Sequence, residues 1–76
     1  MTLDEFVEHF CDELNDTDIN TIDASTEFKK INEWDSLVAL SIIAMIDEEF
    51  EVRFTGNDMI NSITIEDLYK LAISRL

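Results

Sequence analysis

Glycine occurs once and proline never among the 76 residues, so almost nothing in the chain breaks or kinks a helix. Three stretches also repeat apolar residues at intervals of three and four, the spacing of one helix face. The sequence therefore predicts an all-α fold, a small four-helix bundle of three main helices and one short helix. We expect residues 1–76 to form a single domain, because a chain of this length has room for one core.

The first and last helices carry matching start signals. Thr2 followed by Glu5, and Thr64 followed by Asp67, place a hydroxyl at the N-cap and a carboxylate three residues later. An amphipathic stripe follows each cap. The first stripe consists of Leu3, Phe6, Val7, Phe10, Cys11 and Leu14, and the last of Ile65, Leu68, Tyr69, Ala72, Ile73 and Leu76.

The central helix is predicted from Ser36 to Glu49 or Phe50, with Asp35 as its N-cap. Residues 15–35 before it lack a helical stripe, so we expect a long structured loop between the first two main helices, anchored by apolar residues that include Trp34. A short helix is expected over 55–60. The anchors predicted for the loop are Ile19, Ile22, Phe28, Ile31 and Trp34.

The central helix has apolar residues on more than one side. We expect Leu40, Ile43, Ile46 and Phe50 to face the core. Val38 and Met45 would then lie on the opposite side, together with Leu37, as an apolar docking strip beside an acidic rim. That rim consists of Asp47, Glu48, Glu49 and Glu51, which crowd the carboxyl end of the helix against its dipole.

Charge limits the partners of the chain. Eighteen acidic residues against five basic ones give a formal net charge of −13. A phosphate backbone would be repelled, which excludes nucleic acid, and anionic membrane surfaces are disfavoured for the same reason. No apolar run approaches the roughly 20 residues that span a membrane. The field favours basic protein surfaces instead.

Ser36 is the candidate functional residue. Asp35 already provides the cap, which leaves the hydroxyl of Ser36 free to point outward at a helix start. Hydrolytic catalysis would need a base, and the only histidine, His9, falls off the stripe of the first helix. We therefore predict that the chain is not an enzyme and that another protein modifies Ser36.

Acidic spacing in the loop raises one alternative. Four residues match positions 1, 3, 5 and 12 of a calcium-binding EF-hand loop: Asp16, Asp18, Asn20 and Glu27. Thr21 stands where that loop needs glycine and Asp23 where it is usually apolar, so no metal site is predicted. A small acidic interaction or calcium-binding module without a prosthetic group stays open.

The single cysteine, Cys11, excludes an internal disulfide and lies on the first stripe as a small core residue. The amino terminus is acidic where a secretory signal would be basic. Both features favour a cytoplasmic location.

Taken together, these features are similar to those of the acyl carrier protein family over essentially the whole chain. Asp35-Ser36-Leu37 resembles the attachment motif of that family, and residues 46–50 resemble the acidic, aromatic-ended close of its second helix. Phe28, Ile31 and Phe54 also agree.

The resemblance implies a carrier that takes part in lipid metabolism, in fatty acid or polyketide biosynthesis. Ser36 would receive 4′-phosphopantetheine from coenzyme A, and the thiol of that arm would hold acyl groups as thioesters. The resemblance also implies an acyl pocket between the helices, with Ile43, Ile46, Phe54 and Leu68 as its lining. An aminoacyl or D-alanyl carrier remains an alternative, because the same fold and serine serve those substrates.

The implied partners are a holo-acyl-carrier-protein synthase or other phosphopantetheinyl transferase and acyl-transferring or condensing enzymes with basic patches, each meeting a monomeric carrier. The residues expected at these contacts are Asp35, Leu37, Val38, Met45, Asp47 and Glu48. Trp34, Val38 and Ser41 depart from the fatty-acid-synthesis pattern, which favours a specialised member serving a polyketide-like, surface-glycan or aminoacyl pathway.

Overall fold

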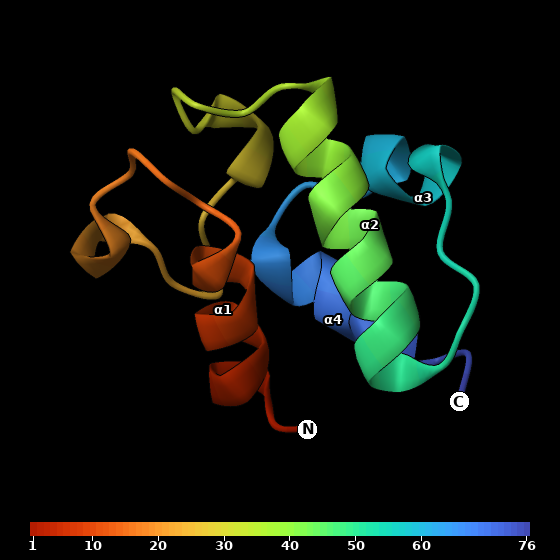
Figure 1. Cartoon of the computed structure of the whole chain (residues 1–76). Coiled ribbons are helices and arrows are strands. Elements are labelled where there is room, and N and C mark those ends of the chain that lie inside the picture. Colours follow the sequence, from red (N-terminus) through yellow and green to blue (C-terminus); the bar gives the residue numbers. More distant parts are fainter.

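The computed structural model describes all 76 residues and contains four α-helices and no strand (Figure 1). The α-helices are α1 (Leu3–Asp12), α2 (Ser36–Phe50), α3 (Gly56–Asn61) and α4 (Ile65–Ile73), and two 3₁₀ turns, η1 (Ile19–Thr21) and η2 (Phe28–Lys30), interrupt the first loop. The predicted small helical bundle is confirmed. No helix is long and apolar enough to cross a membrane.

The helix starts follow the local sequence. Thr2 and Glu5 form the predicted capping box of α1, and Thr64 and Asp67 form that of α4. In each box the hydroxyl accepts the backbone N–H of the acid, and the carboxylate accepts the backbone N–H of the cap. A third box, Thr55 with Asp58, starts α3. These interactions satisfy N–H groups that have no partner inside the helix.

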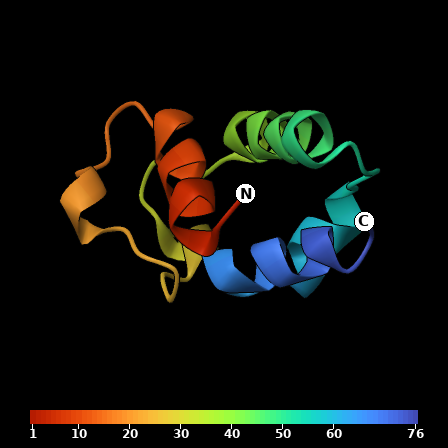
Figure 2. The same ribbon diagram turned by 90° about the horizontal axis from the view of Figure 1, so that it is seen from below.

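Thirteen apolar side chains from all four helices and their connections form one core. Phe6 and Phe10 of α1 are completely buried, as are Ile42 and Ile46 of α2 and Leu68 of α4. Seen from below, α1 and α2 lie above α4, and the first loop projects to one side (Figure 2). The core therefore lies between this pair of helices and α4.

The long loop is anchored by aromatic packing and by a carboxylate. Trp34 stacks on Phe10 with the ring planes 2° apart and meets the edge of Phe28 at 5.0 Å between centroids, so its predicted role as an anchor is confirmed. The carboxylate of Glu33 accepts the backbone N–H groups of Asn15 and Asp16 at 2.9 and 3.0 Å. One side chain therefore joins the two ends of the loop.

Several residues predicted to pack in the core are exposed or only partly buried. Ile73 is 40% and Leu76 77% exposed, because α4 ends at Ile73 and Leu76 lies beyond it. Ile19 is 55% exposed, because it lies in η1 at the outer part of the loop rather than over the core. Cys11 is only partly buried and lies outside the core cluster, because α1 ends at Asp12 and its last turn is not covered on that side.

Candidate functional site at the start of α2

Ser36 is the first residue of α2, and its side chain is exposed. Asp35 precedes it in an extended conformation. The Oδ1 atom of Asp35 accepts the N–H of Val38 at 2.9 Å, and the carbonyl of Asp35 accepts the N–H of Ala39 at 3.0 Å. The predicted N-cap is confirmed, and the Ser36 hydroxyl takes no part in it.

The first turn of α2 suits a negatively charged group. The backbone N–H groups of Ser36 and Leu37 have no acceptor within the chain, because the cap satisfies only the two that follow. The helix dipole adds partial positive charge at this end. A phosphate on the Ser36 hydroxyl would therefore lie where α2 favours an anion.

An apolar groove of about 340 Å³ begins beside Ser36. Its walls come from η2, the amino-terminal half of α2, and α3. Seven of its ten lining residues are hydrophobic, so the groove suits an apolar ligand. The lining consists of Phe28, Lys29, Trp34, Ser36, Ala39, Leu40, Ile43, Gly56, Met59 and Ile60.

The groove differs from the acyl pocket expected from the sequence. Ile43 lines it, but Ile46, Phe54 and Leu68 do not. These three side chains belong to the closed core and are at most 3% exposed. Ile46 and Leu68 lie on the buried side of α2 and α4, and Phe54 lies in the connection between α2 and α3, whereas the groove opens on the flank of α2 next to α3.

Most of the groove lining is not predicted from the sequence pattern. The pattern predicts Phe28 and Trp34 as anchors of the loop and gives no role to Met59 and Ile60 of α3, although all four line the groove. The available signal was the pair of adjacent apolar residues in the short predicted helix, one of which must face outward. Met59 is buried and Ile60 is 70% exposed.

The predicted orientation of α2 is wrong for three residues. Met45 is 8% exposed and Val38 packs against the core, whereas Leu40 is 61% exposed. The buried stripe runs from Val38 through Ile42 and Met45 to Phe50. The outward apolar residues of the first two turns are therefore Leu37 and Leu40, and Met45 presents almost no surface to a partner.

A family model described as the phosphopantetheine attachment site matches residues 4–72. The match runs from the first turn of α1 to Ala72 in α4 and includes Ser36 and the groove. The chain belongs to this family. A comparison with curated protein sequences found no match.

Membership makes the chain a phosphopantetheine carrier, consistent with the acyl carrier protein family. The family attaches 4′-phosphopantetheine covalently and consists typically of non-catalytic carriers. An exposed hydroxyl, two unpaired backbone N–H groups and an adjoining apolar groove fit that group. A carrier domain also implies interaction with a phosphopantetheinyl transferase and with biosynthetic enzymes.

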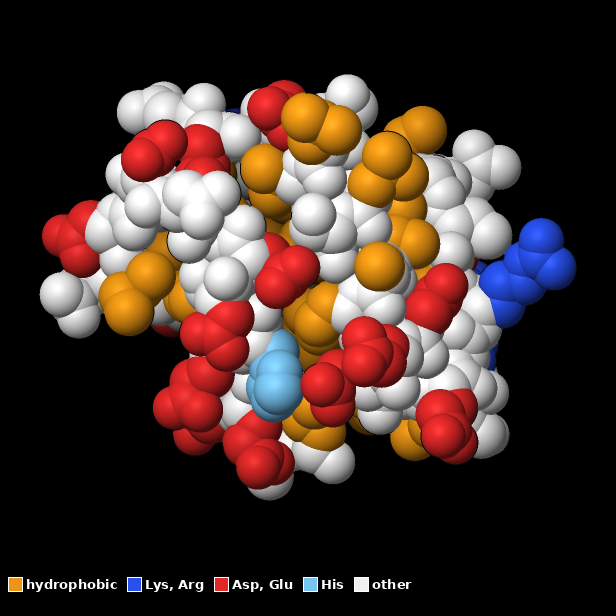
Figure 3. Space-filling view, in the orientation of Figure 1, with side chains coloured by type: hydrophobic (Ala, Val, Ile, Leu, Met, Phe, Trp, Pro, Cys, Tyr) orange, Lys and Arg blue, Asp and Glu red, His pale blue; other side chains and the backbone are white.

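The surface of the carrier is divided along α2. In Figure 3, apolar side chains are exposed over the amino-terminal half of α2, and acidic side chains gather around α1 and the carboxyl-terminal half of α2. Leu37 is 73% exposed. No Asp, Glu, Lys or Arg occurs from Ser36 to Ile46.

The acidic residues at the end of α2 differ in their environment. Asp47 is partly buried, and its Oδ1 accepts the N–H of Phe54 at 2.7 Å, so its carboxylate holds the connection to α3. Glu49 lies 3.8 Å from the imidazole of His9 on α1. Glu48 is exposed and makes no such interaction, so its carboxylate is available to a partner.

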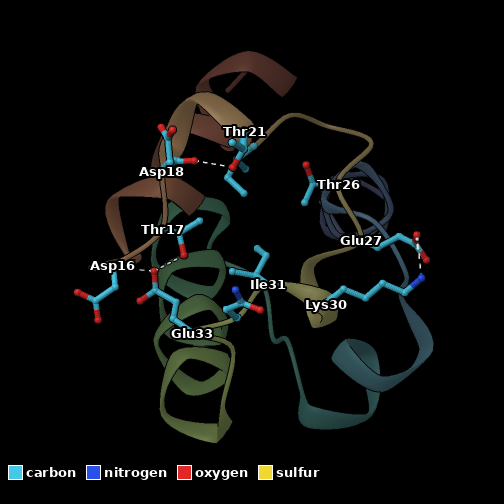
Figure 4. A pocket seen from close by; sticks show the side chains of 11 residues that line it. Asp16, Thr17, Asp18, Thr21, Thr26, Glu27, Lys30, Ile31 and Glu33 are labelled. Atoms are coloured by element: carbon cyan, nitrogen blue, oxygen red, sulfur yellow. Dashed lines mark hydrogen bonds and ion pairs between the residues drawn. The ribbon is translucent and has the colours of Figure 1, made fainter.

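The loop of the carrier contains a polar hollow, whose lining side chains are shown in Figure 4. Asp18 accepts the N–H of Asn20 and caps η1, and Glu27 pairs with Lys30 at 3.3 Å. Across the hollow, Glu33 accepts the hydroxyl of Thr17, and this hydrogen bond with that from the Asn15 N–H lowers the pKa of the Glu33 carboxyl.

The acidic residues of the EF-hand-like spacing do not converge. No group of three His, Cys, Asp or Glu side chains lies close enough to hold a metal ion. Asp18 and Glu27 are instead used in the local interactions of η1 and η2, where each has a partner in its own turn. Both carboxylates therefore have local partners in the loop.

Proposed function

We propose that the protein is an acyl carrier protein in which Ser36 carries 4′-phosphopantetheine. The observation that supports this most strongly is the position of Ser36, exposed at the start of α2 and at the rim of the apolar groove. When bound, phosphopantetheine supplies a flexible arm whose thiol holds an acyl group as a thioester. Residues 1–76 would act as one monomeric carrier domain.

The residues around Ser36 would have separate roles in presenting the serine and in binding the phosphate. Asp35 fixes the first turn of α2 by capping Val38, which keeps the serine hydroxyl outside the helix. The free N–H groups of Ser36 and Leu37 face the side where a phosphate would lie, and the helix dipole stabilises its charge. None of these groups needs to transfer a proton.

The groove would shelter the cargo. Its mostly hydrophobic lining favours an acyl chain over an aminoacyl group, whose ammonium would lose hydration there without a partner. Ile43 keeps its proposed role in the lining, joined by Phe28, Met59 and Ile60. Ile46, Phe54 and Leu68 would support the groove from the core.

Partner recognition would use both kinds of surface on α2. Leu37 and Leu40 offer an apolar contact beside Ser36, and Asp35 and Glu48 lie at either end as exposed carboxylates. Val38 is partly buried against the core, so it would contribute little contact area to a partner. A phosphopantetheinyl transferase and acyl-transferring or condensing enzymes with basic patches are the proposed partners.

Incubation with coenzyme A and a broad-specificity phosphopantetheinyl transferase tests the attachment. The intact mass of the wild type should rise by one phosphopantetheine, and Ser36→Ala should stay unmodified. Ser41→Ala removes an exposed serine five positions along α2 and serves as the matched control, which should be modified normally. An unmodified wild type, or a modified Ser36→Ala, would contradict the proposal.

A second measurement tests the cargo. The transferase can load the chain from octanoyl- or alanyl-coenzyme A, and amide hydrogen exchange then reports on α3. Octanoyl should slow exchange at Met59 and Ile60 because it fills the groove, and alanyl should leave both amides unchanged. Equal protection by both groups would remove the preference for acyl cargo.

A further inference from the structure

Lys29 is the one basic residue that lines the groove beside Ser36. It belongs to η2, directly after the fully buried Phe28. Its ammonium lies 5.7 Å from the centre of the Phe28 ring and donates a hydrogen bond of 2.7 Å to the carbonyl of Ile60 in α3. The two residues are 31 positions apart in the sequence, so this hydrogen bond joins two separate walls of the groove.

The carbonyl that Lys29 reaches has no partner in its own helix. Ile60 lies in the last turn of α3, and the N–H that a longer helix would offer, that of Thr64, donates to Asp67 instead. The ammonium of Lys29 therefore occupies an acceptor that α3 leaves open. A cation at the carboxyl end of a helix is also favoured by the dipole.

The other end of α3 is held by a second cation. Arg75 donates to both carboxylate oxygens of Asp58, at 2.6 and 2.7 Å, and to the carbonyl of Arg53. The short helix is thus fixed at its start by the carboxyl-terminal segment and near its end by η2. Two of the five basic residues of this strongly acidic chain hold α3 in place.

We propose that Lys29 is a positioning residue that fixes α3 across the groove and so limits how far the groove opens. Ile60 is 70% exposed, and the hydrogen bond from Lys29 lies at the surface, where it can open without unfolding the core. When the hydrogen bond breaks, α3 retains the anchor of Arg75 at its start and can move away from η2 at its end. If the groove holds the acyl cargo, its opening limits the size of that cargo, and this consequence rests on the function proposed above. The hydrogen bond between Lys29 and Ile60 does not depend on that function.

The test uses the unmodified chain of residues 1–76 and two variants of equal charge. Lys29→Met keeps the length of the side chain but removes the donor. Lys30→Met changes the next residue, whose amine pairs only with Glu27 at the N-cap of η2, and serves as the matched control. Amide hydrogen exchange is measured through α3, with the amides of Leu68 and Ala72 in α4 as an internal reference for global opening.

Lys29→Met should accelerate exchange in α3 by about fivefold, the effect expected from the loss of one hydrogen bond, with no change in α4. It should also increase the fluorescence of the neutral apolar dye Nile red, and Lys30→Met should change neither. Equal exchange in the two variants, or an acceleration spread evenly over α3 and α4, would overturn the proposal. Because nothing is attached to Ser36 in these measurements, their failure would leave the proposed attachment intact.

Discussion

The two halves of α2 belong to one continuous helix but present opposite chemistry. The amino-terminal half exposes Leu37 and Leu40 beside Ser36 and carries no charge from Ser36 to Ile46. The carboxyl-terminal half contains Asp47, Glu48 and Glu49, and Glu51 follows directly after the helix. The Debye length at physiological salt is about 8 Å, so charges interact over that distance, whereas apolar side chains interact only when they are in direct contact. The acidic half is therefore suited to attract a partner, and the apolar half to hold it.

The largest expected effect comes from the apolar half. Leu37→Ala should lower the specificity constant of the phosphopantetheinyl transferase by about tenfold, because an exposed apolar anchor next to the reacting group is lost. The change should appear mainly in KM, measured with coenzyme A in steady-state kinetics.

Ile63 gives the control for this variant, since it is 59% exposed but does not line the groove. Ile63→Ala should leave the kinetics unchanged. Equal losses of the specificity constant in the two variants would mean that Leu37 has no special role beside Ser36. That result would contradict a docking role for the apolar half of α2.

Within the acidic half, Asp47 should act on stability rather than on recognition. Asp47→Ala leaves the N–H of Phe54 without its acceptor and should cost about 1–2 kcal/mol, which lowers the melting temperature by about 4–8 °C per kcal/mol in a domain of this size. Glu48→Ala should melt like the wild type, because Glu48 makes no such hydrogen bond. Thermal unfolding followed by circular dichroism separates the two, and equal melting temperatures would refute the distinction.

The wall of the groove beside the apolar half depends on an ion pair. The Arg75 guanidinium holds the pKa of the Asp58 carboxyl well below its usual range by hydrogen bonding. A lowered pKa in the folded state stabilises the fold above the unfolded pKa of about 4, and this contribution is lost as the pH falls below that value.

Arg75→Met should therefore lower the free energy of unfolding modestly at pH 7, because a partly exposed ion pair contributes less than a buried one. The difference from the wild type should shrink towards pH 3. Urea unfolding at both pH values measures it. A difference that stays constant between them would show that Arg75 acts through packing on Phe54, which its guanidinium faces at 5.5 Å, rather than through charge.

The smallest effect should come from Glu48, an exposed acidic residue near the end of α2. Glu48→Lys should slow the transferase reaction two- to threefold at low ionic strength, roughly the effect of one rim charge on association. The effect should vanish at about 1 M salt, where the Debye length falls to about 3 Å. A loss that persists in high salt would assign Glu48 a direct contact instead of a long-range role.

The parts of the fold that the sequence predicted are those controlled by neighbouring residues. The capping pairs Thr2 with Glu5 and Thr64 with Asp67, and the cap at Asp35, depend on spacings of three residues, and the structure confirms all three. The stripe of α1 has a charged opposite face, so its buried side was unambiguous at Phe6 and Phe10.

The orientation of α2 could not be obtained in this way. Its first eleven residues are apolar nearly all round, so no polar face marks the outside. The pattern therefore predicts the wrong side of the helix for Leu40 and Met45. What decides between them is packing against α1 and α4, which are distant in the sequence. The groove escaped prediction for the same reason, since contacts such as Lys29 with Ile60 join segments 31 residues apart.

The most direct test of the account is the position of the phosphopantetheine. Trypsin cleaves after Lys30 and Arg53, and the peptide from Ile31 to Arg53 contains two serines, Ser36 and Ser41, and no threonine or tyrosine. Fragmentation of this peptide from the modified wild type should place the whole added mass on Ser36. Added mass on Ser41, or on any peptide outside residues 31–53, would contradict the proposed site.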